Sequence, residues 1–272
     1  GDRENHRHAA TWTATLQLGH SWTIAATTED GFIDGEMALV QRQAYERALL
    51  ENLDRPVPPW IGQLVLAADQ FIVDRPLPDR PDGKTILAGY PWFGDWGRDT
   101  AISLPGLTLC TGRSDIARTI IATFADYLDR GMLPNVFPDA GDAPAYNSVD
   151  ASLWYFEAVW AYYQATNDRD FLAAIAPKLA DIIHWYRQGT RYGIHLDPGD
   201  GLLYAGEPGV QLTWMDAKID NWVVTPRQGK AVEINALWYN ALQISAEIAC
   251  ILAQPDAEYQ QLAAQTADGF TR

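Results

Sequence analysis

One stretch of eleven residues, 90–100, combines aromatic rings with charged side chains in the sequence Tyr-Pro-Trp-Phe-Gly-Asp-Trp-Gly-Arg-Asp-Thr. A sugar needs both kinds, because its ring C–H groups pack on aromatic faces while an arginine and a carboxylate together hold its adjacent hydroxyls. The candidate sugar contacts here are Trp92, Phe93, Asp95, Trp96, Arg98 and Asp99. The alternative is a surface loop whose rings fold back into the core and whose Arg98 and Asp99 form a local salt bridge.

Asp216 is the candidate catalytic acid, in the sequence Gln-Leu-Thr-Trp-Met-Asp-Ala-Lys at residues 211–218. A general acid needs a carboxyl whose neutral form persists near neutral pH, and apolar neighbours favour that form. Trp214, Met215 and Ala217 supply such neighbours along the chain, and Trp214 is also a candidate sugar contact. The alternative is an aspartate that only turns the backbone of a loop.

Two predicted helix starts carry further polar candidates. Asp150 follows Asn-Ser-Val at 147–149, where a carboxylate commonly caps a helix, so capping and sugar contact are the two interpretations. Glu233 either only complements the dipole of its helix or binds hydroxyls, together with Asn235 and Trp238 on inward positions. The five histidines lack metal-ligand spacing, so we expect no metal, and no motif calls for another cofactor.

The elements that must position these residues are mostly helices. Apolar residues recur at helical spacing over 34–55, 59–72, 99–109, 114–130, 147–163, 168–186, 233–253 and 256–267. The long loops 76–97, 131–147 and 189–232 occupy alternate connections, which predicts that they share one end of an α/α toroid or of stacked helical pairs. Residues 151–163 are apolar nearly all round and fit an inner ring, while the alternation at 10–29 predicts two strands from the tail of an earlier β domain.

Composition excludes some classes of function. The net charge of −15 argues against nucleic acid, while eleven tryptophans and twelve tyrosines suit a neutral, polyhydroxylated partner. No apolar run reaches ~18 residues, so no membrane span is predicted, and we expect a cytoplasmic protein. Cys110 and Cys250 are predicted to be buried thiols in a reducing compartment. The sequence starts at Gly1 without a methionine, which is what a piece of a longer protein would show.

Five motifs together resemble the C-terminal domain of glycogen debranching enzymes, the amylo-α-1,6-glucosidase family, which is related to glucoamylases. They are residues 92–100, 133–135, 149–154, 213–217 and 232–240, in order within about residues 60 to 253. The resemblance implies an all-α, (α/α)6 toroid-type helical barrel preceded by a β-sandwich. Residues 1–30 would then be the tail of that sandwich, 31–58 a linker helix, and 59–272 the first half or more of the barrel.

The same resemblance implies removal of α-1,6-linked glucose from a branched α-glucan with inversion. Arg98 and Asp99 would bind the sugar that is cleaved off, and Asp216 would be the general acid. A second carboxylate must activate water, and the sequence shows no convincing counterpart. About seven helices follow Pro59, fewer than such a barrel needs, so we expect an incomplete ring that the remainder of its own barrel or another chain would close. We therefore predict weak hydrolysis by this chain alone.

Other functions stay open at this point. A non-catalytic glucan-binding module, or an inactive fragment, would keep the aromatic cleft without the carboxylate that activates water. A glucoamylase- or trehalase-type exo-hydrolase would use the same barrel on α-1,4 or α-1,1 bonds.

Overall fold

The computed structural model describes residues 10–27, 30–31, 33–53, 56–77, 80–90, 92–137 and 143–272. The chain divides into two compact units, Gly1–Ala48 and Leu49–Arg272. Helix α1 (Gly35–Glu51) begins where predicted, because the Asp34 carboxylate accepts hydrogen bonds from the backbone of Glu36 and Met37 at 3.0 and 3.1 Å. It ends within the second unit.

The strands predicted at 10–29 do not form in the part of this segment that the structure describes. Residues 10–27 contain no strand and are exposed, Trp12 and Trp22 included, while residues 28 and 29 lie outside the description. Two short strands have no stability without a sheet to join, which explains the error. The β-sandwich at residues 1–30 stays a prediction.

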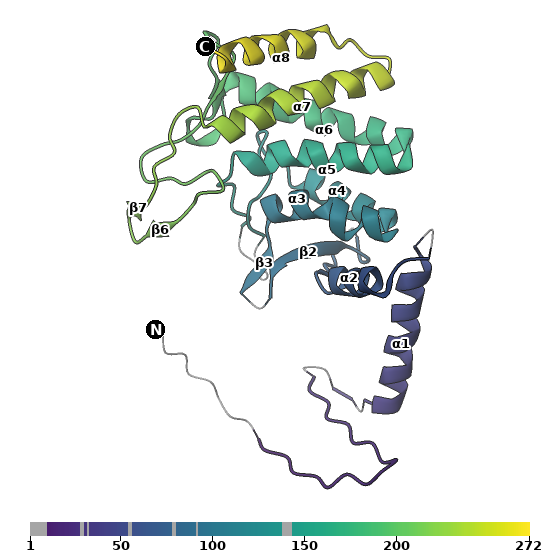
Figure 1. Cartoon of the computed structure of the whole chain (residues 1–272). Helices are drawn as coiled ribbons and strands as arrows, with labels where there is room; N and C mark the ends of the chain where they lie inside the picture. The colour runs from purple at the N-terminus through teal and green to yellow at the C-terminus, as the bar shows by residue number, and fades with distance from the viewer. Residues whose placement is uncertain are drawn as a thin grey trace. The chain divides into compact units, whose positions relative to one another are not determined.

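The second unit is a double layer of helices (Figure 1). The inner row consists of α3 (Gly97–Leu107), α5 (Asp150–Thr166) and α7 (Val232–Ile251), with α5 packed against both of the others. The second layer consists of α4 (Ser114–Asp126) and α6 (Arg169–Gln188), while α2 (Pro59–Asp69) and α8 (Ala257–Phe270) lie at the two ends of the inner row. Each of these four helices packs against the inner row: α2 on α3, α4 on α3 and α5, α6 on α5 and α7, and α8 on α7. The predicted helical class is confirmed, and the closed toroid stays a prediction.

Helix α5 lies at the centre of this unit because it is apolar nearly all round. Its buried residues include Leu153, Tyr155 and Ala158, which face different directions around the helix. Residues 151–163 therefore form a central helix of this unit, while their place in the inner ring of a closed barrel stays a prediction. Large buried rings, including Tyr186 of α6 and Trp238 of α7, stack beside it with centroids 6.4 Å apart.

Short strands occupy two of the predicted loops. Strands β1 (Ile72–Asp74), β2 (Lys84–Gly89) and β3 (Phe93–Asp95) form an antiparallel sheet in that order, with the register Ile72↔Ile86 and Leu87↔Asp95. Further along, β4 (His195–Leu196) pairs with β5 (Leu203–Tyr204), and β6 (Lys218–Ile219) with β7 (Trp222–Val223). All of these strands except β2 have only two or three residues, too short for a period of two to show, and β2 (Lys-Thr-Ile-Leu-Ala-Gly) does not alternate, so we did not predict them.

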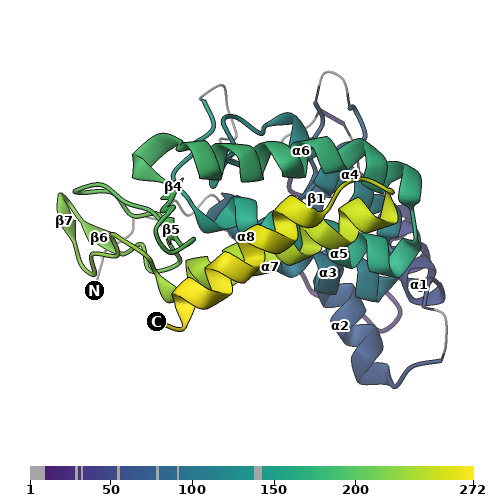
Figure 2. The same cartoon turned by 90° about the horizontal axis from the view of Figure 1, so that it is seen from above.

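The long loops meet at one end of the second unit, as predicted, and Figure 2 shows the β4–β7 segments gathered beyond the helix ends. Gly97 donates its backbone N–H to Asn135 at 2.9 Å, and Val149 donates to Leu212 at 2.9 Å. Each bond joins the start of an inner helix to the next long loop along the chain. The loops therefore fix where the inner helices begin.

The predicted burial of both cysteines is wrong. Cys110 lies in a short 3-10 helix, Leu109–Thr111, and Cys250 lies near the end of α7, and both are exposed free thiols. Each belongs to an apolar pattern in the sequence, but it occupies the outward side of its helix.

Candidate active site

The N-termini of the inner helices carry most of the charged candidates. Arg98 and Asp99 lie in the first turn of α3, Asp150 is the first residue of α5, and Glu233 lies in the first turn of α7. Backbone N–H groups at helix N-termini lack partners within the helix and favour negative charge. This end of the second unit therefore suits carboxylates.

Arg98 is buried and anchored by Asp150. Its Nε atom lies 2.9 and 2.8 Å from the two carboxylate oxygens of Asp150, which is itself only 2% exposed. Ser148 donates a short hydrogen bond to the same carboxylate and accepts one from the backbone of Ala151 at 3.1 Å. Asp150, predicted as a sugar contact or a helix cap, is thus placed beneath the arginine with its oxygens occupied.

Asp216 approaches the same arginine from the surface. Its Oδ2 atom lies 3.5 Å from Nη1 of Arg98, and its side chain is 46% exposed. The apolar enclosure predicted for Asp216 is wrong, because Trp214 is exposed and the loop lies at the surface. Arg98 therefore joins one buried carboxylate to one that solvent reaches.

Asp99 stands next to this cluster, beside a groove of about 320 Å³. Loss of hydration raises the pKa of the Asp99 carboxyl above its usual value; Arg98 opposes this, and the charges of Asp150 and Asp216 add to it. The other residues that line the groove are Phe71, Leu87, Ala88, Ile102, Ser103 and Leu107. A mostly apolar wall with a carboxyl at its edge is the mixture that a sugar ring requires.

The aromatic candidates are on the surface around the turn between β2 and β3. Trp92 is 74% exposed, Phe93 is also exposed, and Trp96 is partly buried. The rings of Phe93 and Trp96 meet edge to face with centroids 6.0 Å apart. The alternative in which these rings fold back into the core therefore does not hold for Trp92 and Phe93.

Asp95 and Asn235 were predicted as sugar contacts, but the structure gives both a structural role. Asp95 is 2% exposed, and its Oδ2 lies 3.1 Å from Nε of Arg75 and accepts a hydrogen bond from Thr85 at 3.2 Å, inside the β1–β3 sheet. Asn235 is 1% exposed; it accepts from the backbone N–H of Leu203 at 2.6 Å and donates to the carbonyl of Leu203 at 3.2 Å. We therefore leave both out of the site.

Glu233 has an arginine partner that sequence reasoning missed. Arg227 donates to both of its carboxylate oxygens, and the Arg227 guanidinium lies 5.9 Å from the centre of the exposed Trp214 ring. The ion pair of Glu233 with Arg227 thus links the start of α7 to the loop that carries Trp214 and Asp216. Arg227 gave no sequence signal, whereas Ser148 could have been found as a hydroxyl two residues before a capping aspartate.

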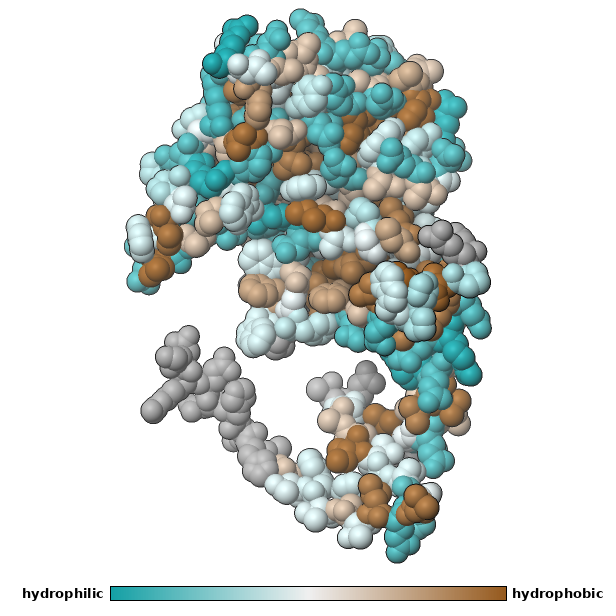
Figure 3. Space-filling model, viewed as in Figure 1, coloured by the Kyte–Doolittle hydropathy of each residue, from teal (hydrophilic) through white to brown (hydrophobic). Residues whose placement is uncertain are grey.

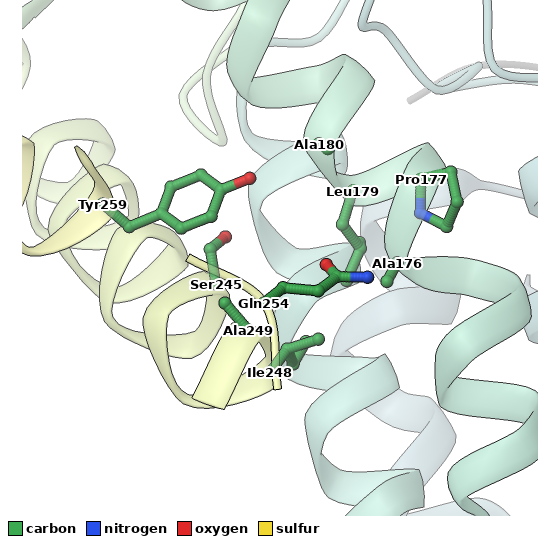
Figure 4. Close-up of a pocket in the computed structure, with 9 residues that line it drawn as sticks. All are labelled: Ala176, Pro177, Leu179, Ala180, Ser245, Ile248, Ala249, Gln254 and Tyr259. Atoms are coloured by element: carbon green, nitrogen blue, oxygen red, sulfur yellow. The ribbon is translucent and has the colours of Figure 1, made fainter. Parts of the chain in front are cut away.

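Another cavity, between α6, α7 and the start of α8, lies away from these residues (Figure 4). Its volume is about 100 Å³, and alkyl side chains such as Leu179 and Ile248 form much of its wall. The Tyr259 ring points across it toward α6, and burial raises the pKa of the Tyr259 hydroxyl. It has no charged lining residue, so we assign it no chemistry.

The described residues contain neither a cluster suited to a metal ion nor a helix suited to a membrane. Within the ranges given above, no group of three or more histidine, cysteine, aspartate or glutamate side chains is placed to hold a metal ion. In the same part of the chain, no helix has the length and apolar character needed to cross a membrane.

Comparison with known proteins places this cluster in a wider context. The family model described as "Amylo-alpha-1,6-glucosidase" matches residues 66–272, the range that contains every site candidate named above. The chain is also 27% identical over 223 residues to a glycogen debranching enzyme of Saccharomyces cerevisiae. That match covers 60% of this chain and 14% of the yeast enzyme, so the chain spans only a small part of that relative.

One solved structure supports the fold of the second unit. An uncharacterised conserved protein from Thermus thermophilus superposes with a TM-score of 0.54 at 16% identity, covering 77% of this chain and 62% of that one. A rhamnosidase from Klebsiella oxytoca with rhamnose bound gives a TM-score of 0.47 at 16% identity, covering 64% of this chain and 32% of that one. At 16% identity the first structure bears on the fold alone, and the second, with a TM-score under 0.5, adds no support.

Proposed function

Because the chain belongs to the amylo-alpha-1,6-glucosidase family, we propose that it acts on α-1,6-linked glucose at the branches of an α-glucan, as in glycogen debranching. The observation that carries this proposal is the arrangement around Arg98. One guanidinium joins the buried Asp150 to the exposed Asp216, with Asp99 beside them. An anchored cation with two carboxyls within reach of solvent suits the hydroxyls and the bridging oxygen of a glycoside.

Each residue then has a distinct part. Asp150 holds Arg98 by its Nε, which leaves the terminal nitrogens to face the substrate. Arg98 and Asp99 bind the hydroxyls of the glucose that is released, while Trp92, Phe93 and Trp96 offer aromatic surface nearby. A sugar bound to Arg98 takes the place of Asp216 at Nη1, and Asp216 then faces the glycosidic oxygen and donates a proton to it.

Inversion needs a second carboxylate, roughly 6.5–9.5 Å from the first, to activate water. Glu233 is engaged with Arg227, and Asp150 is buried beneath Arg98, so we assign the role of base to neither. We therefore expect this chain to bind glucans better than it hydrolyses them.

The test is glucose release and oligosaccharide affinity on the wild type and on Asp216→Asn. General acid catalysis contributes about 10²–10⁴ to a rate, so the variant should lose at least about 100-fold of whatever release the wild type shows, with affinity nearly unchanged. Glu207→Gln is the matched control, because Glu207 is an exposed carboxylate of the same loop, outside the cluster. Equal release by wild type and Asp216→Asn would remove Asp216 from the mechanism.

The missing base favours one second candidate, a non-catalytic glucan-binding module. Binding without any release by the wild type, even at high protein concentration, would establish that function instead. Comparing α-1,6, α-1,4 and α-1,1 linked substrates separates the debranching activity from a glucoamylase- or trehalase-type one.

A further inference from the structure

The β6–β7 hairpin projects from the loop immediately after Asp216 (Figure 1). Its register pairs Lys218 with Val223 and Ile219 with Trp222, and Val224 donates its backbone N–H to Ala217 at 3.2 Å. The turn at Asp220 uses a left-handed backbone with φ of 51°, which aspartate tolerates. A regular hairpin of this kind has two distinct faces.

One face of this hairpin is entirely apolar. Residues opposite each other on antiparallel strands point to the same side, and side chains alternate along each strand. Ala217, Ile219, Trp222 and Val224 therefore share a face, and all four are exposed, with Ile219 at 58% and Trp222 at 60%. Figure 3 shows brown and pale atoms on this projection. An apolar set confined to one side of an exposed hairpin points to a binding surface.

The apolar face is held in place relative to Asp216. Gln211 donates its side-chain amide to the carbonyl of Ala217 at 3.0 Å, and Lys218 donates to the carbonyl of Gly209 at 3.2 Å. Both bonds tie the base of the hairpin to the preceding segment of the same loop. The face therefore begins one residue after the carboxyl that approaches Arg98.

We propose that the apolar face of Ala217, Ile219, Trp222 and Val224 binds the glucan chain on the leaving-group side of the bond. This inference rests on the proposed function. An acid that protonates the bridging oxygen stands on the side of the departing chain, and the hairpin starts at that acid. The ring faces of glucose are apolar and uncharged, as are the four side chains of this face. The charged residues of the segment are Asp216 just before the face, Asp220 in the turn and Lys218 on the opposite face. The hairpin thus selects for a substrate with several sugars beyond the branch.

The experiment is calorimetric titration of the 272-residue chain with maltoheptaose and, separately, with glucose. Trp222→Ala should weaken the affinity for maltoheptaose by about tenfold, since one stacked ring is lost, while its affinity for glucose stays within about twofold of the wild type. Val223→Ala, on the opposite face, and Trp60→Ala, at a 62% exposed indole of α2, should change neither affinity. Thermal unfolding of each variant should match the wild type, because Trp222 is exposed.

A variant at Asp99 tests the proposed function independently of the hairpin. Asp99→Asn should weaken the binding of glucose and maltoheptaose alike. If Asp99→Asn does so but Trp222→Ala binds both sugars like the wild type, the hairpin inference is overturned and the proposed function stands. If the wild type binds neither sugar, the proposed function fails and the inference fails with it. If Trp222→Ala only converts a dimer to a monomer in sedimentation, the face is a self-association surface, which also overturns the inference.

Discussion

Arg98 shows how one residue can organise carboxylates at different depths. Its Nε is committed to Asp150 beneath it, and its Nη1 faces Asp216 above it. The Ser148 hydroxyl fixes Asp150 in turn. Because a guanidinium presents several donors in one plane, an anchored Nε also fixes the direction of its terminal nitrogens. The sequence predicted which residue types meet here. It did not predict that Asp150 anchors the arginine while Asp216 stays exposed, because that depends on which carboxylate the fold buries.

We predict that the charged form of Asp99 lowers the stability of the folded protein, although Asp99 is needed to bind the sugar. Its pKa is raised, so the folded state prefers the protonated carboxyl. This preference stabilises the fold fully below the ordinary value of 3.8 and is lost as the pH rises through the higher folded-state pKa. Asp99→Asn imitates the neutral form, so we expect it to unfold at a higher temperature than the wild type at pH 7. The melting temperatures of the wild type and of Asp99→Asn, measured from pH 3 to 8, should become equal below the ordinary pKa of Asp99. A difference in melting temperature that grows toward acid pH would contradict this.

At the scale of elements, the start of α3 depends on a glycine. A Cβ atom placed on Gly97 would lie 2.1 Å from the carbonyl oxygen of Pro134, where the loop before α5 crosses the helix. We expect Gly97→Ala to cost about 3 kcal/mol in the free energy of unfolding, since backbone must move. It should also weaken sugar binding by displacing Arg98. Chemical denaturation and titration measure both effects.

The control for this prediction lies in the same helix. Gly106 has no atom within 4 Å of a built Cβ, so Gly106→Ala should stabilise the protein by about 0.5–1 kcal/mol. Equal effects of the two substitutions would show that the contact with Pro134 does not constrain α3.

The helices were predictable and the small sheets were not, for a physical reason. A helix such as α6 (Arg169–Gln188) repeats its pattern over five turns and starts at Asp168, whose carboxylate accepts from the backbone of Phe171 at 3.0 Å. Strand β3 has three residues and exists through its pairing with β2. Asp95 and Asn235 were misplaced because their partners, Arg75 and Leu203, lie 20 and 32 residues away, and sequence spacing does not show such contacts.

At the scale of the molecule, the double layer leaves grooves along its last helices. Two lie between α7 and α8, with volumes of about 280 and 480 Å³, and the larger one is lined in part by Cys250 and Tyr239. The smaller groove has a mainly apolar wall, which includes Ala236 and Phe270, whereas Glu247 and Asp256 help to line the larger one. That another part of a barrel, or another chain, covers this side stays a prediction.

Both free thiols are exposed, so a thiol reagent can report on the surfaces around them. Cys250 lines the larger groove, whereas Cys110 lies on the short 3-10 helix after α3. We expect both to react with a disulfide reagent in the native protein at low concentration, because neither is covered, with Cys110→Ser and Cys250→Ser assigning each reaction. If another copy covers the α7–α8 face, Cys250 alone should become protected as protein concentration rises. Two thiols that react only after denaturation would restore the buried positions that the sequence predicted and contradict the arrangement of α7 described above.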